Sequence, residues 1–466
     1  MISEPNILTR HNVIPVVDSM PADLLTPLAV YLKLSANAAD SFLLESVEGG
    51  QHLARYSFIG ANSNRRLDGA IFEELREHFS KFTVESDADL PPFIGGAIGY
   101  LGFDCCEWYE PSLERDQDQT ADAAMLFYET IVAFDHAKQV VKIISLAFAD
   151  TSDDLETALS NARSRNQNVR KLLENGTIDI PQPSLTETAP QVEPNWERSD
   201  LEAAVTEIKE LIRAGECYQV VLSQCFTRPT SADAVSIYRA LRSLNPSPYM
   251  FLIDMGEKQI VGASPEMLVR CEGRRLEYRP IAGTRPRGKD PNEDTSLAEE
   301  MKLDQKEVAE HLMLVDLGRN DLGRVAEFGS VKVDRLMSVE KYSHVQHLVS
   351  SLSATLRDGL DRFDALASCF PAGTVSGAPK VAAINIIRKL EPTKRGVYAG
   401  AVGYFDYAGN MDTCIAIRTL VLENGIARVQ AGAGIVADSV PANEYEETVN
   451  KAKGLLRAVQ IAEEGL

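Results

Sequence analysis

The sequence lacks the features of a membrane or secreted protein. No apolar run approaches the length of a membrane-spanning helix. The N-terminal MISEPNILTR has no basic region followed by an apolar core, so no signal peptide is expected. The seven cysteines include no Cys-x-x-Cys pair, which fits a reducing compartment better than a disulfide framework. These absences predict a cytoplasmic protein without a membrane partner.

Basic residues are also scarce. The chain has 47 Lys and Arg against 68 Asp and Glu, a formal net charge of −21. Such an acidic chain is repelled by the phosphates of nucleic acids and by anionic membranes, so neither is an expected partner. An anionic ligand must therefore be bound by local arginines and backbone N–H groups, against the overall field.

The organisation of the chain is read from its length and composition. Its 466 residues exceed the usual size of a single core, so two domains or one large composite domain are expected. Residues 1–175 alternate short apolar runs with turns, as mixed strands and helices do. Residues 176–195 hold four prolines and many small polar residues, which predicts a linker. Residues 196–466 form the second region.

An anion-binding turn followed by an acidic helix is predicted between residues 279 and 324. The segment RPIAGTRPRG combines glycine and proline turns with Arg285 and Arg287, which can present guanidinium groups to an anion. A capping box, Ser296-x-x-Glu299, predicts a helix that begins at Ser296. Glu307 and Glu310 then lie on one helical face. This combination suggests a metal ion that bridges protein carboxylates to an anionic substrate.

A second acidic pair follows a second glycine-rich segment near the C-terminus. The helix that begins near Pro441 places Glu444, Glu447 and Lys451 on one face. Each Glu-x-x-Glu pair alone is more often solvated surface, because acidic residues are abundant here. Two pairs, each beside a glycine-rich loop, favour a magnesium site, since Mg²⁺ binds a few carboxylates together with substrate oxygens.

Three other segments could carry chemistry. FPAGTVSGAPK at 370–380 could cradle an anion, although it is not a P-loop and could equally be a plain loop. GAGIVADS at 432–439 superficially matches a dinucleotide fingerprint, but the following helix starts too late to bind pyrophosphate. In KYSHVQHLVS, His344 and His347 have no further ligands at zinc spacing, so zinc is not expected.

A strand in CIAIRTLVL is predicted to carry Arg418. A guanidinium flanked by Ile417 and Leu420 is unusual in a core and natural in a pocket that binds a carboxylate.

Taken together, these motifs resemble those of the chorismate-utilising enzymes over nearly the whole chain. The resemblance rests on LLES at 43–46, NPSPYMF at 245–251, GASPE at 262–266, PIAGTRPRG at 280–288, DLGRNDLGR at 316–324, HVQHLVS at 344–350, FPAGTVSGAPK at 370–380, GAGIVADS at 432–439 and EYEETVNKA at 444–452. It implies an α+β fold with two large, mostly antiparallel sheets packed between helical layers.

The resemblance also implies a role for each candidate site residue. The catalytic residues are Glu266, the general acid for the departing C4 hydroxyl, His347, associated with pyruvate elimination, and Thr374, which lines the ring. The substrate-binding residues are Gly283, Thr284, Tyr398, Arg418, Gly432, Gly434 and Lys451. The Mg²⁺ ligands are Glu307, Glu310, Glu444 and Glu447, some of them through water.

Two positions indicate the branch of the family. Isochorismate- and salicylate-forming members carry a water-activating lysine where this chain has Gln219. Members that aminate C4 typically carry lysine where this chain has Ala282. Both positions favour attack of ammonia at C2, which yields anthranilate and pyruvate in tryptophan biosynthesis. The alternatives are 4-amino-4-deoxychorismate formation and an inactive scaffolding relative.

The resemblance finally implies two partners. No glutaminase motif is present, so a separate glutamine amidotransferase subunit is expected to supply ammonia to this large subunit. L-tryptophan is expected to inhibit from a pocket shared between the two regions. Its residues would be Glu45, Ser46, Pro248, Tyr249, Met250 and Phe251, with Tyr249, Met250 and Phe251 forming one apolar slot for the indole ring.

Overall fold

Two large antiparallel sheets form the centre of the molecule. The computed structural model describes residues 11–46, 55–85, 89–113, 122–149, 152–180, 191–342 and 345–465. The first sheet has 12 strands in the order β1-β8-β7-β3-β2-β11-β12-β21-β22-β10-β18, with β9 paired to β10. The second has 10 strands in the order β15-β17-β14-β13-β20-β19-β5-β6-β4, with β16 paired to β17. The predicted α+β architecture is confirmed.

The strands of the first sheet are β1 (Val13–Pro21), β2 (Ser41–Glu45), β3 (Tyr56–Ala61), β7 (Thr130–Asp135), β8 (Val140–Phe148), β9 (Glu193–Pro194), β10 (Gln219–Pro229), β11 (Tyr249–Asp254), β12 (Lys258–Ser264), β18 (Gly377–Ala378), β21 (Thr419–Glu423) and β22 (Ile426–Ile435). Those of the second are β4 (Arg65–Asp68), β5 (Gly96–Leu101), β6 (Ala123–Tyr128), β13 (Met267–Glu272), β14 (Arg275–Tyr278), β15 (Ile281–Pro286), β16 (Lys332–Lys341), β17 (Val345–Thr355), β19 (Ala401–Asp406) and β20 (Met411–Ile415). The regions 1–175 and 196–466 contribute strands to both sheets.

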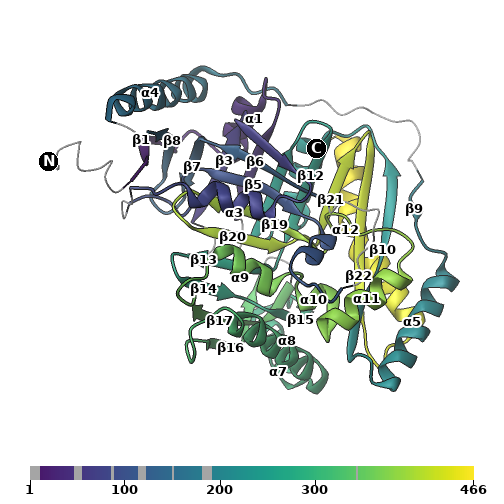
Figure 1. Cartoon of the computed structure of the whole chain (residues 1–466). Helices are drawn as coiled ribbons and strands as arrows, with labels where there is room; N and C mark the ends of the chain where they lie inside the picture. Colours follow the sequence, from purple (N-terminus) through teal and green to yellow (C-terminus); the bar gives the residue numbers. More distant parts are fainter. Residues whose placement is uncertain are drawn as a thin grey trace.

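The helices are α1 (Pro27–Ser35), α3 (Phe72–Ser80), the 3-10 helix η2 (Phe103–Trp108), α4 (Ser152–Asn175), α5 (Arg198–Ala214), α6 (Ala234–Leu244), α7 (Pro291–Leu303), α8 (Gln305–Gly323), α9 (Arg362–Cys369), α10 (Gly373–Ser376), α11 (Lys380–Leu390) and α12 (Pro441–Glu464). No helix in the described part of the chain is both long enough and apolar enough to cross a bilayer. Figure 1 shows α4 across one end of the molecule and α7 and α8 at the other.

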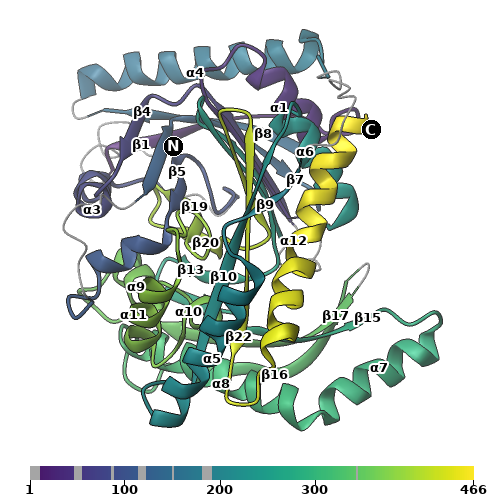
Figure 2. The same cartoon turned by 90° about the vertical axis from the view of Figure 1, so that its right-hand side faces the viewer.

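Two apolar cores hold the layers together. One joins side chains of both sheets, such as Phe42 and Phe251 from the first and Phe405 from the second. The other lies on the opposite face of the first sheet, beneath α1, α6 and α12. Figure 2 shows α12, in yellow, running along β22. A strand with both faces covered exposes no polar face, which explains the nearly continuous apolar runs in the sequence.

The acidic helix expected from Ser296 is two helices. Asp290 caps α7, accepting hydrogen bonds from the backbone N–H groups of Asn292 and Glu293, so this helix begins before Ser296. Asp304 ends α7 in an extended conformation and then caps α8. The break places Glu307 in the first turn of α8, where the helix dipole favours a carboxylate.

Candidate active site

A cavity of about 1040 Å³ opens between the β10–β22 pair and the helices α6, α8 and α12. The expected residues that line it are Glu266, Thr284, Glu310, His347, Thr374, Tyr398, Arg418, Gly432, Gly434, Glu444, Glu447 and Lys451. They come from segments as far apart in sequence as the turn after β12, which carries Glu266, and α12, which carries Lys451, so the fold brings them together. Gly283 and Glu307 are not among the lining residues.

Glu266 lies in the turn between β12 and β13 with only 6% of its surface exposed. Its backbone is fixed because its carbonyl accepts a hydrogen bond from Ile415 N at 3.0 Å. Burial raises the pKa of its carboxyl group to about 8, although Thr374 and the positive charge of Arg418 act in the other direction. Glu266 is therefore largely protonated at neutral pH and can donate a proton.

His347 is held in β17 as a neutral imidazole. Its Nδ1 lies 3.0 Å from the carbonyl oxygen of Gly283 and 3.0 Å from Oγ1 of Thr284. We assign the proton to Nδ1 because the carbonyl can only accept, which leaves Nε2 free to take a proton. Burial lowers the pKa of His347, and the charge of Arg418 lowers it further.

Arg418 is not in a strand, and that prediction was wrong. It lies in the connection between β20 of the second sheet and β21 of the first, with a left-handed backbone, φ +49°, and it lines the cavity. Burial lowers the pKa of its guanidinium group. Among the described residues no carboxylate forms an ion pair with Arg418. A half-buried guanidinium without a counter-ion is suited to bind a carboxylate ligand.

The floor of the cavity is made by β10 and β22, where two glycines let side chains approach the backbone. A Cβ atom at Gly434 would lie 2.6 Å from Nε2 of Gln219, and one at Gly432 would lie 2.7 Å from the hydroxyl of Tyr398. The buried Oε1 of Gln219 has no hydrogen-bond partner in the described part of the chain. The buried Oγ1 of Thr374 also makes no hydrogen bond of regular geometry there, although Thr374 lies close enough to Glu266 to lower the pKa of that carboxyl group. Both are available to a ligand.

Three of the four expected carboxylates, Glu310, Glu444 and Glu447, line the cavity, and Glu307 lies one helical turn before Glu310 in α8. Burial and then the charges of Glu307 and Glu447 raise the pKa of Glu310. Burial also raises the pKa of Glu444, with Glu447 adding to it and Ser439 opposing it. Mutual repulsion of this kind is relieved by a cation, and carboxylate oxygens are the donors that Mg²⁺ prefers. The residues therefore fit a magnesium ion.

These carboxylates are not assembled into one cluster. Glu307 pairs with Arg285 at 3.0 Å, and Glu447 pairs with Lys451 at 2.7 Å. Within the described ranges, no group of three or more His, Cys, Asp or Glu side chains is placed to hold a metal ion. Moving these side chains into one coordination sphere requires exchange of the two ion pairs.

Lys306 is a cavity residue that the sequence interpretation missed. It lines the cavity, and its charge lowers the pKa of both Glu310 and Glu444. Its position four residues before Glu310, on the same helical face, was the available signal.

The residues expected to bind tryptophan lie where β2 pairs with β11. Glu45 is opposite Met250 in the antiparallel register, and its carboxylate accepts hydrogen bonds from Tyr238 and, at 3.1 Å, from Arg242. Ser46 has a buried hydroxyl with no partner among the described residues. Pro248 is buried just before β11.

The single apolar slot expected for the indole ring is not formed. Met250 packs in the core beneath α6 and α12. Phe251 packs in the other core, between the two sheets, and Tyr249 also contacts that core between the sheets. Successive residues of a strand point to opposite faces, so these three side chains cannot line one slot. Tyr249 also donates a hydrogen bond to Asp412 at 3.0 Å.

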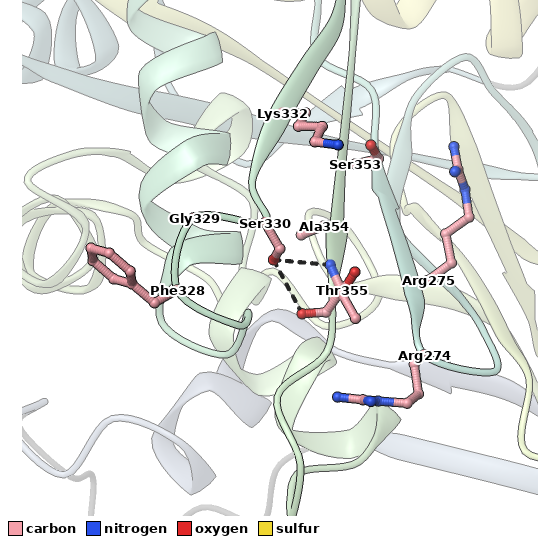
Figure 3. Close-up of a pocket in the computed structure, with 9 residues that line it drawn as sticks. All are labelled: Arg274, Arg275, Phe328, Gly329, Ser330, Lys332, Ser353, Ala354 and Thr355. Carbon is pink, nitrogen blue, oxygen red and sulfur yellow. Dashed lines mark hydrogen bonds between the residues drawn. The ribbon is translucent and has the colours of Figure 1, made fainter.

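A second hollow of about 490 Å³ lies against β14, β16 and β17 (Figure 3). Arg274 and Arg275 line it, and Ser330 hydrogen-bonds to Thr355, while Phe328 points away into solvent. None of the expected site residues belongs to it.

The fold and the cavity thus suit a small carboxylated ligand. Comparison with known proteins identifies the family. Residues 39–457 match the chorismate binding enzyme family. Anthranilate synthase component 1 from Aquifex aeolicus is 44% identical, covering 98% of this chain and 96% of the relative. Its counterpart from Thermus thermophilus is 46% identical, covering 96% and 97%. The chain belongs to the chorismate binding enzyme family.

Solved structures agree with this assignment. The crystal structure of anthranilate synthase component I from Streptococcus pneumoniae has a TM-score of 0.74 and 36% identity, covering 94% of this chain and 98% of that one. MenF, the menaquinone-specific isochorismate synthase from Escherichia coli, has a TM-score of 0.75 at 21% identity, covering 98% of each chain. The second similarity concerns the fold alone.

Proposed function

We propose that this chain is the chorismate-aminating subunit of an anthranilate synthase, which converts chorismate and ammonia to anthranilate and pyruvate. The observation that carries the proposal is the pair of buried groups in one cavity with pKa values moved in opposite directions. The pKa of Glu266 is raised to about 8, so this group is a proton donor. The pKa of His347 is lowered, so this group is a proton acceptor. Such a pair suits a reaction that needs both an acid and a base near neutral pH.

The residues of the cavity support a defined order of events. Arg418 and Lys451 bind the carboxylate of the enolpyruvyl side chain, and Tyr398 and the backbone at Gly434 border it. Ammonia forms a bond to C2 of the ring while the C4 hydroxyl departs, Glu266 protonates that hydroxyl so that it leaves as water, and the new ammonium group loses one proton. The proton on C2 then passes to His347, the C3–O bond breaks, and the departing enolpyruvate takes up a proton and is released as pyruvate.

Glu307, Glu310, Glu444 and Glu447 are proposed to hold Mg²⁺ against the ring carboxylate. The ion would withdraw electrons from the ring and so favour departure of the hydroxyl. In support, Glu310, Glu444 and Glu447 line the same cavity as Glu266 and His347.

We also propose a glutaminase partner and inhibition by L-tryptophan. The name component 1 carried by the relatives implies a further component that completes the enzyme. For tryptophan, the unpartnered Ser46 hydroxyl and the buried Glu45 carboxylate can meet the charged groups of an amino acid.

Product analysis tests the proposed function. The chain is incubated with chorismate, Mg²⁺ and an ammonium salt, and the products are separated by chromatography. Anthranilate is expected. Accumulation of 4-amino-4-deoxychorismate would instead show that the chain aminates C4, which is the alternative activity. Formation of isochorismate would show that water is the nucleophile.

A further inference from the structure

Arg285 holds one of the four proposed metal ligands outside the cavity. From β15, its Nη1 contacts Glu307 at 3.0 Å, its Nη2 contacts Asp304 at 3.2 Å and its Nε contacts Glu300 at 3.3 Å. The side chain of Arg285 is 18% exposed and that of Glu307 is 23% exposed. Water screens this pair less than an ordinary surface ion pair, so the contact has a measurable strength.

The carboxylate of Glu307 faces Gly283, where the register of β15 shifts. A Cβ atom at Gly283 would lie 3.1 Å from Oε2 of Glu307, and Gly283 is left-handed with φ +65°. Glu310, one helical turn further along α8, lines the cavity instead. A single helix thus carries one carboxylate into the cavity and has the other tied to a neighbouring strand.

Arg285 would keep two ion-pair partners after release of Glu307. Asp304 and Glu300 would still accept hydrogen bonds from its guanidinium group, whereas Glu307 would gain a divalent cation. The exchange therefore moves a carboxylate without leaving a charge unpaired, which keeps its cost small.

We propose that Arg285 is a positioning residue that competes with the metal ion for Glu307, so that the ion binds only when Arg285 gives this carboxylate up. The proposal rests on the metal site of the proposed function. It means that the free protein binds a divalent cation more weakly than the same four carboxylates would without Arg285. The metal site is complete only when the bound ion, or the ion together with the substrate, attracts Glu307 strongly enough to displace Arg285.

Metal binding in the absence of chorismate tests this directly. Mn²⁺ alone is titrated into the purified chain and followed by electron paramagnetic resonance. Arg285→Gln should tighten Mn²⁺ binding by roughly threefold to tenfold, the equivalent of a partly shielded ion pair. Arg285→Lys should give a smaller gain, since one ammonium group cannot contact three carboxylates at once.

Arg275→Gln is the matched control. Arg275 is also a strand arginine, paired with Glu277 at 2.9 Å, but it lines the second hollow (Figure 3) and should leave Mn²⁺ binding unchanged. Unchanged or weaker binding in Arg285→Gln would overturn the proposal and make Arg285 a fixed support of Glu307. If Arg285→Gln does not fold, Arg285→Lys must show the gain or the proposal is wrong. A Mn²⁺ affinity that Glu310→Gln leaves intact would instead refute the metal site itself.

Discussion

At the residue scale, burial moves the pKa values of the two groups proposed to transfer protons in opposite directions. A carboxyl group without solvent keeps its proton, and an imidazole without solvent loses it. The pKa of Glu266 rises to about 8, and the pKa of His347 falls below its ordinary value. Both groups are thus in the required protonation state over the same pH range.

A pH profile follows from these values. Raising the pH through about 8 deprotonates Glu266, so kcat/KM should fall above that value. Lowering the pH should reduce kcat/KM only below the ordinary histidine range, when His347 becomes charged. Glu266→Gln should lower kcat by roughly 10²–10⁴-fold and remove the alkaline decline. A wild-type profile that stays flat to high pH would contradict the role of Glu266.

Arg418 allows ligand binding to be separated from folding. Its left-handed backbone is one that asparagine adopts readily, so Arg418→Asn should keep the thermal unfolding midpoint. Loss of charge-assisted hydrogen bonds to a carboxylate should raise the dissociation constant for chorismate by roughly tenfold to a hundredfold. Calorimetric titration measures the binding, and unchanged affinity would exclude Arg418 from the substrate site.

At the scale of elements, the sequence predicted the C-terminal helix and misplaced the start of the acidic helix. The helix expected from Pro441 is α12, which begins at that residue. The break at Asp304 was missed because Ser296 and Glu299 imitate a helix start, while Asp290 and Pro291 provide the real one. Local patterns of this kind do not reveal which of two caps the tertiary structure uses.

The candidate site was predicted through motifs, and its internal contacts were not. Twelve of the fourteen expected catalytic, substrate-binding and metal residues line one cavity. The displacement of Glu307 toward Arg285 depends on how β15 packs against α8, which no sequence spacing specifies. The opposite orientation of Met250 and Phe251 follows from strand alternation, once the strand assignment of that segment is known. His344 lies outside the described residues.

The β10–β22 pair offers a test of the cavity floor. Gly434→Ala would place a Cβ atom 2.6 Å from Nε2 of Gln219, and this flexible side chain would have to move into the cavity. Because the strand itself need not shift, the unfolding midpoint should change little. Displacement of a group beside the substrate should lower kcat/KM by roughly tenfold or more. Ala433→Gly, on the opposite face of the same strand, is the control, and equal losses in both variants would refute this account.

At the scale of the whole molecule, the shared sheets link the proposed regulatory residues to the cavity. β2 pairs with β11, β11 pairs with β12, and β12 ends two residues before Glu266. A ligand at Glu45 and Ser46 would therefore contact a strand connected through β11 and β12 to Glu266, the proposed catalytic acid. To inhibit, it must bind an inactive arrangement of these strands more tightly than the active one.

Inhibition by L-tryptophan is the corresponding prediction. Ser46→Phe should replace the buried, unpartnered hydroxyl with an aromatic ring and abolish inhibition, with kcat for the ammonium-dependent reaction retained. Initial rates with and without a large excess of tryptophan measure this. Wild-type rates that do not respond to tryptophan would refute the regulatory assignment and leave the catalytic one untouched.

The stoichiometry of products tests the central claim most directly. The purified chain is given chorismate and Mg²⁺ with either ammonium or glutamine, and anthranilate and pyruvate are quantified in the same samples. We expect the wild type to form equal amounts of both products with ammonium and neither product with glutamine. Glu266→Gln should form both products far more slowly than the wild type. Pyruvate without anthranilate, or no consumption of chorismate by the wild type with ammonium, would contradict the account.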